Sequence, residues 1–365
     1  MEAGIVGIPY IGKTMLFNAL TALGVKSEGG AGRPNVGIAQ VPDLRLETIS
    51  QYIDTKKLVP ATIHLVDVAG LVAGASKGEG VGNKFLSHVR NVDALIHVVR
   101  CFDDLGIPHV AGAVDPVRDI DQVDTELMLA DLEQVEAMLD KAQRNARTGD
   151  REAKLRLQVI EACIAALGEG RPVSSLMGSG GLLDCVEGRD VIKSSALLTA
   201  KAVLYVANVG EDDLDGQSDY VKQMADYAAE RDAAVVPVCA KLEAELTELD
   251  KSERAEMLEA LGLSEPALDV LARTIYQVLG QQSFFTAGPK EIRAWAVPAG
   301  ARAPVAAGVI HSDIQRGFIR VEVHTVGDLE EHKSEAAIRS AGKLRTEGKN
   351  YVMQEGDVCH FLFNV

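Results

Sequence analysis

The sequence predicts an α/β fold in which a mostly parallel sheet is interrupted by a helical insertion and followed by a smaller β-rich domain. Three observations lead to this prediction. Apolar strand-like runs alternate with glycine turns and helical stretches in the first hundred residues. Two long segments, 119–146 and 151–168, then repeat apolar residues every three or four positions. Past Gln282 the pattern changes to short segments of alternating polarity.

The first strands are expected where short apolar runs meet loops. Residues 4–7 have the composition of a buried strand that enters a loop, and residues 13–23 have the apolar spacing of a helix. Residues 63–66 and 94–99 are further apolar runs of strand length. Strand, loop and helix in this order indicate a parallel sheet with helices on its faces.

The helical insertion is expected at 119–199. Its segments 119–146 and 151–168 are separated by a Thr-Gly-Asp turn, which predicts an antiparallel, coiled-coil-like hairpin. The apolar face of such a hairpin is usually core, and partner binding is the alternative. Apolar runs at 202–207 and 233–238 indicate that the sheet resumes, and helices are expected within 241–281.

These patterns divide the chain into three predicted domains. A nucleotide-binding domain is expected to comprise residues 1–118 and 200–281, with the insertion at 119–199 between its two parts. Alternating segments such as 317–323 and 360–365 predict a β-rich domain over 282–365.

Charge and composition limit the function classes. The net charge of −16 argues against general attraction to nucleic acid and against specific DNA binding. Residues 290–349, however, hold ten Lys or Arg against eight Asp or Glu, which hints at docking of an anionic partner, with ordinary surface variation as the alternative. No apolar run is long enough to span a membrane, the N-terminus does not resemble a signal peptide, and five scattered cysteines suit a reduced compartment. A cytoplasmic protein without a membrane partner is expected.

The motif that carries chemistry follows the first predicted strand. It matches G-x-x-x-x-G-K-[ST] and predicts a P-loop, in which glycines let backbone N–H groups approach phosphate oxygens. Lys13 would pair with the β- and γ-phosphates, and the Thr14 hydroxyl would ligate Mg²⁺. The predicted phosphate-binding residues are Gly7, Ile8, Pro9, Tyr10, Ile11, Gly12, Lys13 and Thr14.

A second motif, D-x-x-G, lies at the end of the strand at 63–66. Asp67 comes 54 positions after Lys13 and is the expected second Mg²⁺ ligand. The N–H of Gly70 would sense the γ-phosphate. The glycine-rich segment 74–82 is predicted to act as a nucleotide-dependent switch, and a passive glycine loop is the alternative.

From this point the sequence resembles the YchF/Obg-like ATPase family. The resemblance is carried by DVAGLVAGASKGEGVGNKFLSHVRNVDALIHVVRCFDD at 67–104 and by EIRAWAVPAGARAPVAAGVIHSDIQRGFIRVEV at 291–323, with further matches at 114–133, 207–212 and 355–365. It implies an OBG-type G domain of the P-loop NTPase class, a helical hairpin and a C-terminal β-grasp-like TGS domain. It also implies a preference for ATP and binding to the ribosome.

Two segments are expected to contact the base. GTPases use N-K-x-D, whose Asp accepts hydrogen bonds from guanine, whereas this chain has Asn208-Val209-Gly210-Glu211. The longer Glu211 cannot hold its carboxylate where Asp would, so guanine donors would stay unpaired at roughly 1–3 kcal/mol each. Cys239 and Ala240 begin a segment that resembles the last nucleotide-binding loop. Asn208 and Glu211 as ordinary loop residues are the alternative.

Hydrolysis needs an oriented water molecule, and this sequence lacks the residue that orients the water in many GTPases. Leu71 stands where many GTPases have a catalytic Gln. The resemblance to the family implies that His109 takes this role, and a structural histidine is the alternative. Tyr10 replaces an Asn that the family usually has, and residues 25–39 contain no Thr, with Ser27 as their only hydroxyl. Binding is expected to survive these changes, while switching or hydrolysis is altered.

The function predicted from all of this is a Mg²⁺-dependent ATPase that binds the ribosome and couples its nucleotide state to translation or stress regulation. The large subunit is the favoured contact, with ribosomal RNA as the candidate partner. One alternative is a GTP-hydrolysing switch in translation or ribosome assembly. The other is a nucleotide-sensing adaptor with negligible turnover.

Overall fold

The computed structural model describes residues 1–21, 35–68, 81–178, 181, 183 and 185–364, with the backbone alone for 81–85. The chain forms two compact units. The first unit comprises Met1–Gly37 and His64–Val270, and the second unit comprises Ile38–Ile63 and Leu271–Val365. Residues 38–63 therefore group with the C-terminal part, whereas the predicted domain boundaries assign them to the nucleotide-binding domain.

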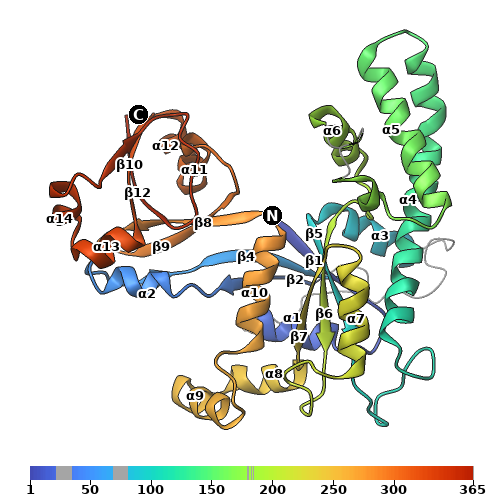
Figure 1. Ribbon diagram of the computed structural model, residues 1–365, viewed down its shortest axis with the longest axis horizontal. Coiled ribbons are helices and arrows are strands. Elements are labelled where there is room, and N and C mark those ends of the chain that lie inside the picture. Colours follow the sequence, from blue (N-terminus) through green and yellow to red (C-terminus); the bar gives the residue numbers. More distant parts are fainter. Residues whose placement is uncertain (22–34, 69–80, 179–180, 182, 184, 365) are drawn as a thin grey trace. The chain divides into compact units, whose positions relative to one another are not determined.

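The first sheet has six strands in the order β2-β4-β1-β5-β6-β7 (Figure 1). Strands β4, β1, β5, β6 and β7 pair in parallel throughout. The bounds are β1 Glu2–Val6, β2 Asn35–Val41, β4 Ala61–Asp67, β5 Ala94–Arg100, β6 Ala202–Asn208 and β7 Ala234–Val238. The strands predicted at 4–7, 63–66, 94–99, 202–207 and 233–238 are confirmed, and the central strand β5 is buried along its whole length, as a parallel strand covered on both faces should be.

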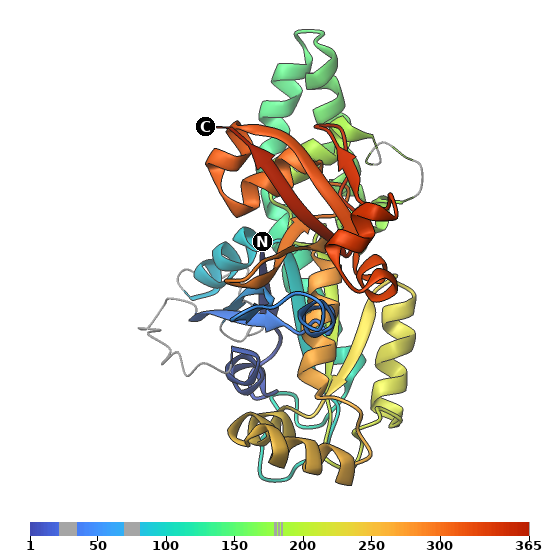
Figure 2. The same ribbon diagram turned by 90° about the vertical axis from the view of Figure 1, so that its left-hand side faces the viewer.

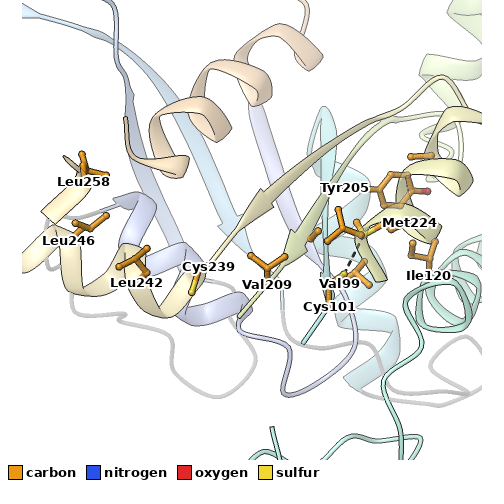
Figure 3. Packing of buried hydrophobic residues seen from close by; sticks show 13 residues of the cluster. Val99, Cys101, Ile120, Tyr205, Val209, Met224, Cys239, Leu242, Leu246 and Leu258 are labelled. Carbon is orange, nitrogen blue, oxygen red and sulfur yellow. Dashed lines mark hydrogen bonds between the residues drawn. The ribbon is translucent and has the colours of Figure 1, made fainter. Parts of the chain in front are cut away.

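Outside the helical insertion, the helices of the first unit are α1 Lys13–Thr21, α3 Val81–Asn91, α7 Asp219–Ala229, α8 Ala240–Glu248 and α9 Lys251–Ala260. Of these, α1 contacts β1, and α7 contacts β6 and β7. Helix α10 Ala267–Val278 begins in the first unit and ends in the second. Figure 3 shows one core cluster, in which Val99 and Tyr205 of the sheet pack with Met224 of α7. The same cluster continues through Val209 and Cys239, so the loops after β6 and β7 are anchored by buried apolar side chains.

The helical hairpin extends from the first unit as two antiparallel helices, α4 Pro116–Ala146 and α5 Arg151–Gly168 (Figures 1 and 2). Both begin at aspartate caps, since Asp115 accepts from the N–H of Arg118 and Asp150 from that of Ala153. The short helices η2 Val173–Leu176 and α6 Val186–Ser195 follow. The predicted hairpin is confirmed.

The second unit contains a mixed six-stranded sheet in the order β11-β10-β12-β8-β9-β3. Its strands are β3 Leu58–Val59, β8 Gln281–Ala287, β9 Ile292–Pro298, β10 Phe318–Thr325, β11 Arg345–Glu347 and β12 Asp357–Phe363. Its helices are α2 Arg45–Ser50, α11 Ala303–Ile310, α12 Ser312–Arg316, α13 Val326–His332 and α14 Glu335–Ser340. A small mixed sheet with packed helices is the arrangement expected of a β-grasp-like domain.

Two further expectations concern cysteines and membranes. Four of the five cysteines are buried, as expected of small apolar side chains, but Cys185 is exposed. Its sulfur accepts from the N–H of Gly188 at the start of α6, which gives it a capping role instead. Within the described ranges, no helix combines the length and the apolar character that crossing a bilayer requires.

Candidate nucleotide-binding site

The P-loop joins the end of β1 to the start of α1, as the motif requires. Two of its residues must be glycine. Gly7 has φ of 144°, and a Cβ there would lie 2.5 Å from the carbonyl oxygen of Val98. Gly12 has φ of 91°, and its Cβ would lie 2.5 Å from Nδ2 of Asn208. The buried side chains of Ile8 and Ile11 fix the loop between these glycines.

Lys13 is folded back over this loop. Its Nζ donates to the carbonyl oxygens of Gly7 at 3.0 Å and Ile8 at 2.5 Å. Burial lowers the pKa of Lys13 to about 8, although nearby Asp67 acts in the opposite direction. Among the described residues, the hydrogen bonds of this buried ammonium group go to carbonyl oxygens, which leaves its positive charge available to attract phosphate.

The two predicted Mg²⁺ ligands lie together. The hydroxyl of Thr14 donates to Oδ2 of Asp67 at 3.2 Å, and Nδ2 of Asn35 donates to the same oxygen at 3.3 Å. A hydroxyl beside a carboxylate provides hard oxygen donors, which fits Mg²⁺ with the remaining positions left to phosphate and water. Asn35 was not singled out by the sequence, because β2 brings it next to Asp67 only in the folded chain.

A pocket of about 400 Å³ lies over these groups. Its lining joins most of the P-loop to the end of β4 and comprises Pro9, Tyr10, Ile11, Gly12, Lys13, Thr14, Met15, Asp67 and Val68. Tyr10 has φ of 64°, in the left-handed region that a bulky residue rarely adopts, and its side chain is 66% exposed. The structure thus places six of the eight predicted phosphate-binding residues around one cavity together with Asp67, whereas Gly7 and Ile8 are not part of its lining.

Asn208 links this pocket to the loop after β7. Its Nδ2 donates to the carbonyl oxygen of Ile11 at 2.8 Å, and its Oδ1 accepts from the N–H of Ala240 at 3.1 Å. Both bonds are buried, and the residue is 5% exposed. Asn208 therefore fixes the P-loop against the segment expected to approach the base.

The remaining predicted base-contact residues divide into a buried and an exposed set. The buried set comprises Val209 in the loop after β6, and Cys239 and Ala240 directly after β7. Glu211 is exposed, and its Oε1 lies 2.7 Å from Nζ of Lys241, which is itself exposed. The carboxylate of Glu211 therefore already has a cationic partner within the same pair of loops.

His109 does not line the phosphate pocket. Its Nε2 lies 2.9 Å from Oδ2 of Asp119 in the first turn of α4, and its Nδ1 accepts from the N–H of Ala111. The imidazole is only 6% exposed, so in this arrangement it is held against the hairpin. His97, expected to be core, is buried beside Tyr205, and burial lowers its pKa to about 3.

The loop that carries His109 is organised by a residue that the sequence did not reveal. Arg100 is buried at the end of β5 and donates to the carbonyl oxygens of Phe102, Asp104 and Ile107 at 2.9–3.1 Å. Three bonds from one rigid guanidinium hold this irregular segment in place. An arginine at the end of an apolar strand was the only available signal.

Several predicted residues lie outside the described part of the chain. Gly70, Leu71 and most of the glycine-rich segment 74–82 are among them, as are Ser27 and the rest of 25–34. Predictions about the γ-phosphate sensor and the two switch segments therefore stay predictions.

Comparisons with known proteins relate the whole chain to one group. Residues 281–364 match the family model YchF-GTPase_C, described as a protein of unknown function (DUF933), and residues 2–144 match the model described as 50S ribosome-binding GTPase. The chain is 46% identical over 367 residues to "Ribosome-binding ATPase YchF" of Haemophilus influenzae, with 100% of this chain and 99% of the relative covered. It is 45% identical over 370 residues to the protein of the same name in Bacillus subtilis, with both chains fully covered. The solved structure of the Schizosaccharomyces pombe YchF GTPase superposes with a TM-score of 0.85 at 34% identity, covering 99% of this chain and 97% of that one.

Proposed function

This chain belongs to the YchF family, and from that premise we propose that it is a ribosome-binding ATPase whose nucleotide site requires Mg²⁺. The observation that carries the proposal is the convergence of Lys13, Thr14 and Asp67 on one cavity at the P-loop. A cation for the phosphates and two oxygen donors for the metal are the parts that phosphoryl transfer needs. When bound, Mg²⁺ would neutralise charge on the phosphate oxygens, and Thr14 and Asp67 would hold it.

ATP is the proposed substrate, although the names of related proteins refer to both ATP and GTP hydrolysis. In a GTPase a free carboxylate accepts from the N1–H and N2–H₂ groups of guanine. Here the carboxylate of Glu211 is paired with Lys241 at 2.7 Å, so guanine would have to compete with an ammonium group for it. Adenine has an acceptor at N1, which a free carboxylate would repel. The ion pair between Glu211 and Lys241 weakens that repulsion.

Calorimetric titration with ATP and GTP in the presence of Mg²⁺ tests the base preference. ATP is expected to bind at least several-fold more tightly than GTP, and Glu211→Asp should narrow the difference because the shorter side chain restores the carboxylate position of N-K-x-D. Equal affinities in the parent protein would contradict the proposal.

The site assignment is tested by Lys13→Ala, with Lys222→Ala on α7 as the matched control. Removing the one lysine of the P-loop should abolish tight nucleotide binding, while the exposed Lys222 lies elsewhere and its loss should leave the affinity unchanged. A folded Lys13→Ala protein with parental ATP affinity would show that the phosphates bind elsewhere.

A nucleotide-sensing adaptor with negligible turnover is the second candidate, and one observation favours it. His109, the proposed water-orienting residue, is held by Asp119 and does not line the pocket. It would have to leave that pair in order to act. Single-turnover hydrolysis of ATP separates the candidates, since the adaptor binds ATP without measurable phosphate release.

We also propose which part of the ribosome the protein contacts and where in the cell it acts. The large subunit is the favoured contact, ribosomal RNA the candidate partner and the cytoplasm the expected location. Support comes from the basic residues at 290–349 in the second unit and from the ribosome-binding relatives. Co-sedimentation with ribosomes and with separated subunits, in ATP-analogue, ADP and nucleotide-free conditions, tests this. A full-length protein that never pellets with ribosomes would refute it.

A further inference from the structure

The turn of the helical hairpin is basic within an acidic protein. Residues 140–156, the hairpin tip, contain six Lys or Arg against three Asp or Glu, a balance of +3 in a chain whose net charge is −16. By comparison, the longer segment 290–349 has a balance of only +2. The six cations are Lys141, Arg144, Arg147, Arg151, Lys154 and Arg156.

These cations are not explained by ion pairing. Five of them are exposed and Arg156 is half-buried, and none forms an ion pair within the part of the chain that the structure describes. In the segment 290–349 the opposite holds for several residues. Arg293, Arg316, Arg339 and Arg345 there each lie within 4.0 Å of a carboxylate oxygen. The charge of the hairpin tip is therefore more available to an anionic partner.

Helix stability does not explain all of them either. Arg144 and Arg147 lie at the end of α4, where a cation stabilises the helix dipole. Arg151 and Lys154 lie at the start of α5, where a cation is unfavourable and an anion such as Glu152 is preferred. Two cations at a helix start, each acting against the helix, indicate a role outside the hairpin.

A hollow between the two helices adds the second observation. Its volume is about 450 Å³, within the range of roughly 300–1,000 Å³ typical of small-ligand sites. Ala137, Met138 and Ala142 supply an apolar surface, while Lys141, Asn145 and Arg156 supply two cations and an amide. An apolar wall, an amide that can pair with a base edge and two phosphate-binding cations match the chemistry of one nucleotide.

We propose that the hairpin tip binds single-stranded RNA, with one unpaired nucleotide in the pocket between α4 and α5 and the adjoining phosphates on the surrounding cations. The inference rests on the proposed ribosome binding and names a contact of that interaction. Unpaired bases in RNA loops can be splayed out and read individually, whereas bases inside a duplex cannot. A membrane is a poorer fit, because residues 140–156 contain no exposed large hydrophobic side chain for insertion.

The test uses the full-length protein and two kinds of tip variant. The double variant Lys141→Glu and Arg156→Glu reverses the charge of the pocket. Ala137→Trp leaves every charge unchanged and fills the pocket from an exposed position on α4. The matched control is Lys222→Glu with Lys251→Glu, which makes the same change in net charge at exposed positions on α7 and α9, outside both the hairpin tip and the segment 290–349. Circular dichroism and ATP titration verify that each protein is folded with an intact nucleotide site.

Binding is measured by fluorescence anisotropy with a labelled single-stranded RNA 12-mer, an RNA duplex of the same length and vesicles of anionic lipid. The parent protein should prefer the single strand. The charge-reversal variant should lose at least tenfold in affinity for the single strand. The slope of its log affinity against log salt concentration should become less negative by about 1.4, because each of the two lost phosphate contacts contributes about 0.7 to that slope. Ala137→Trp should lose affinity by a similar factor, and the control should change less than threefold.

Three results of the anisotropy experiment would overturn the inference. They are an equal loss of RNA affinity in the tip and control variants, unaltered RNA binding by Ala137→Trp, and a parent protein that binds anionic vesicles but not single-stranded RNA. Ribosome co-sedimentation of the same proteins separates this inference from the proposed function. If the parent and the tip variants pellet equally, only the tip contact is wrong, and if the parent does not pellet, ribosome binding itself is wrong.

Discussion

Replacement of Asn208 by Ala should uncouple the P-loop from the loop after β7. The side chain donates to the carbonyl of Ile11 at 2.8 Å and accepts from the N–H of Ala240 at 3.1 Å, and both partners are backbone groups in a buried environment. Alanine supplies neither bond. It leaves one buried acceptor and one buried donor unpaired, at a cost of about 1–3 kcal/mol each.

The summed effect is about 2–6 kcal/mol, and it is expected to divide between a lower free energy of unfolding and weaker nucleotide binding. Part of it will lower the free energy of unfolding. The rest will appear as weaker nucleotide binding, because ATP must then order the two loops itself. If about 1.4–2.8 kcal/mol falls on binding, the affinity for ATP decreases 10- to 100-fold.

Urea denaturation and calorimetric ATP titration measure the two parts separately. Asn208→Asp is a near-isosteric companion variant, which can still accept from Ala240 but presents a carboxylate oxygen to the carbonyl of Ile11. Asn208→Asp should lower the free energy of unfolding and the ATP affinity at least as much as Asn208→Ala does. Asn18→Ala, at an exposed position on α1, is the control and should change neither quantity. An Asn208→Ala protein with parental stability and ATP affinity within threefold of the parent would refute this reasoning.

Three more predictions follow from the site and the hairpin. His109→Ala should slow single-turnover hydrolysis while ATP affinity stays nearly constant; a lower free energy of unfolding with an unchanged rate would instead identify a structural histidine. Asn35→Ala should raise several-fold the Mg²⁺ concentration needed for half-maximal ATP binding, because Asp67 loses a neighbour that orients it; an unchanged Mg²⁺ titration would contradict this. Burial raises the pKa of the half-buried Asp124 to about 6, so its ionisation disfavours folding as pH rises from about 4 to 6. Asp124→Asn keeps an acceptor for the hydroxyl of Tyr227 and should stabilise the protein by about 1–2 kcal/mol at pH 7 but not at pH 4, as urea denaturation at the two pH values can verify.

Much of the fold was predictable because its signals are local. The strands β1, β4, β5, β6 and β7 are short apolar runs bounded by turns, and the hairpin helices carry a helical period over many turns. The P-loop was predictable for a related reason. Gly7 and Gly12 both have positive φ, which glycine adopts without strain, so the spacing of the two glycines within the motif identifies the loop. The contacts that exclude a larger residue at these positions come from Val98 and Asn208 on other strands.

The tertiary structure decided the features that depend on contacts between distant residues. Strand β3 has only two residues, and its partner strand β9 lies more than two hundred positions further along the chain. No periodicity in residues 38–63 could therefore indicate that they belong to the second unit. Asn35 gained its role from Asp67, 32 positions along the chain, which folding brought next to it.

The same distinction applies to function. The sequence alone predicted a phosphate site, since Lys13 and Thr14 are neighbours in the chain and Asp67 ends a recognisable strand. It could not show that Glu211 is paired with Lys241, that His109 is held by Asp119, or that Lys141 and Arg156 line one pocket. Composition along the chain records how many charges a segment carries. Whether a charge is neutralised by a partner or left available to a ligand depends on distances of a few ångströms, which only the folded chain determines.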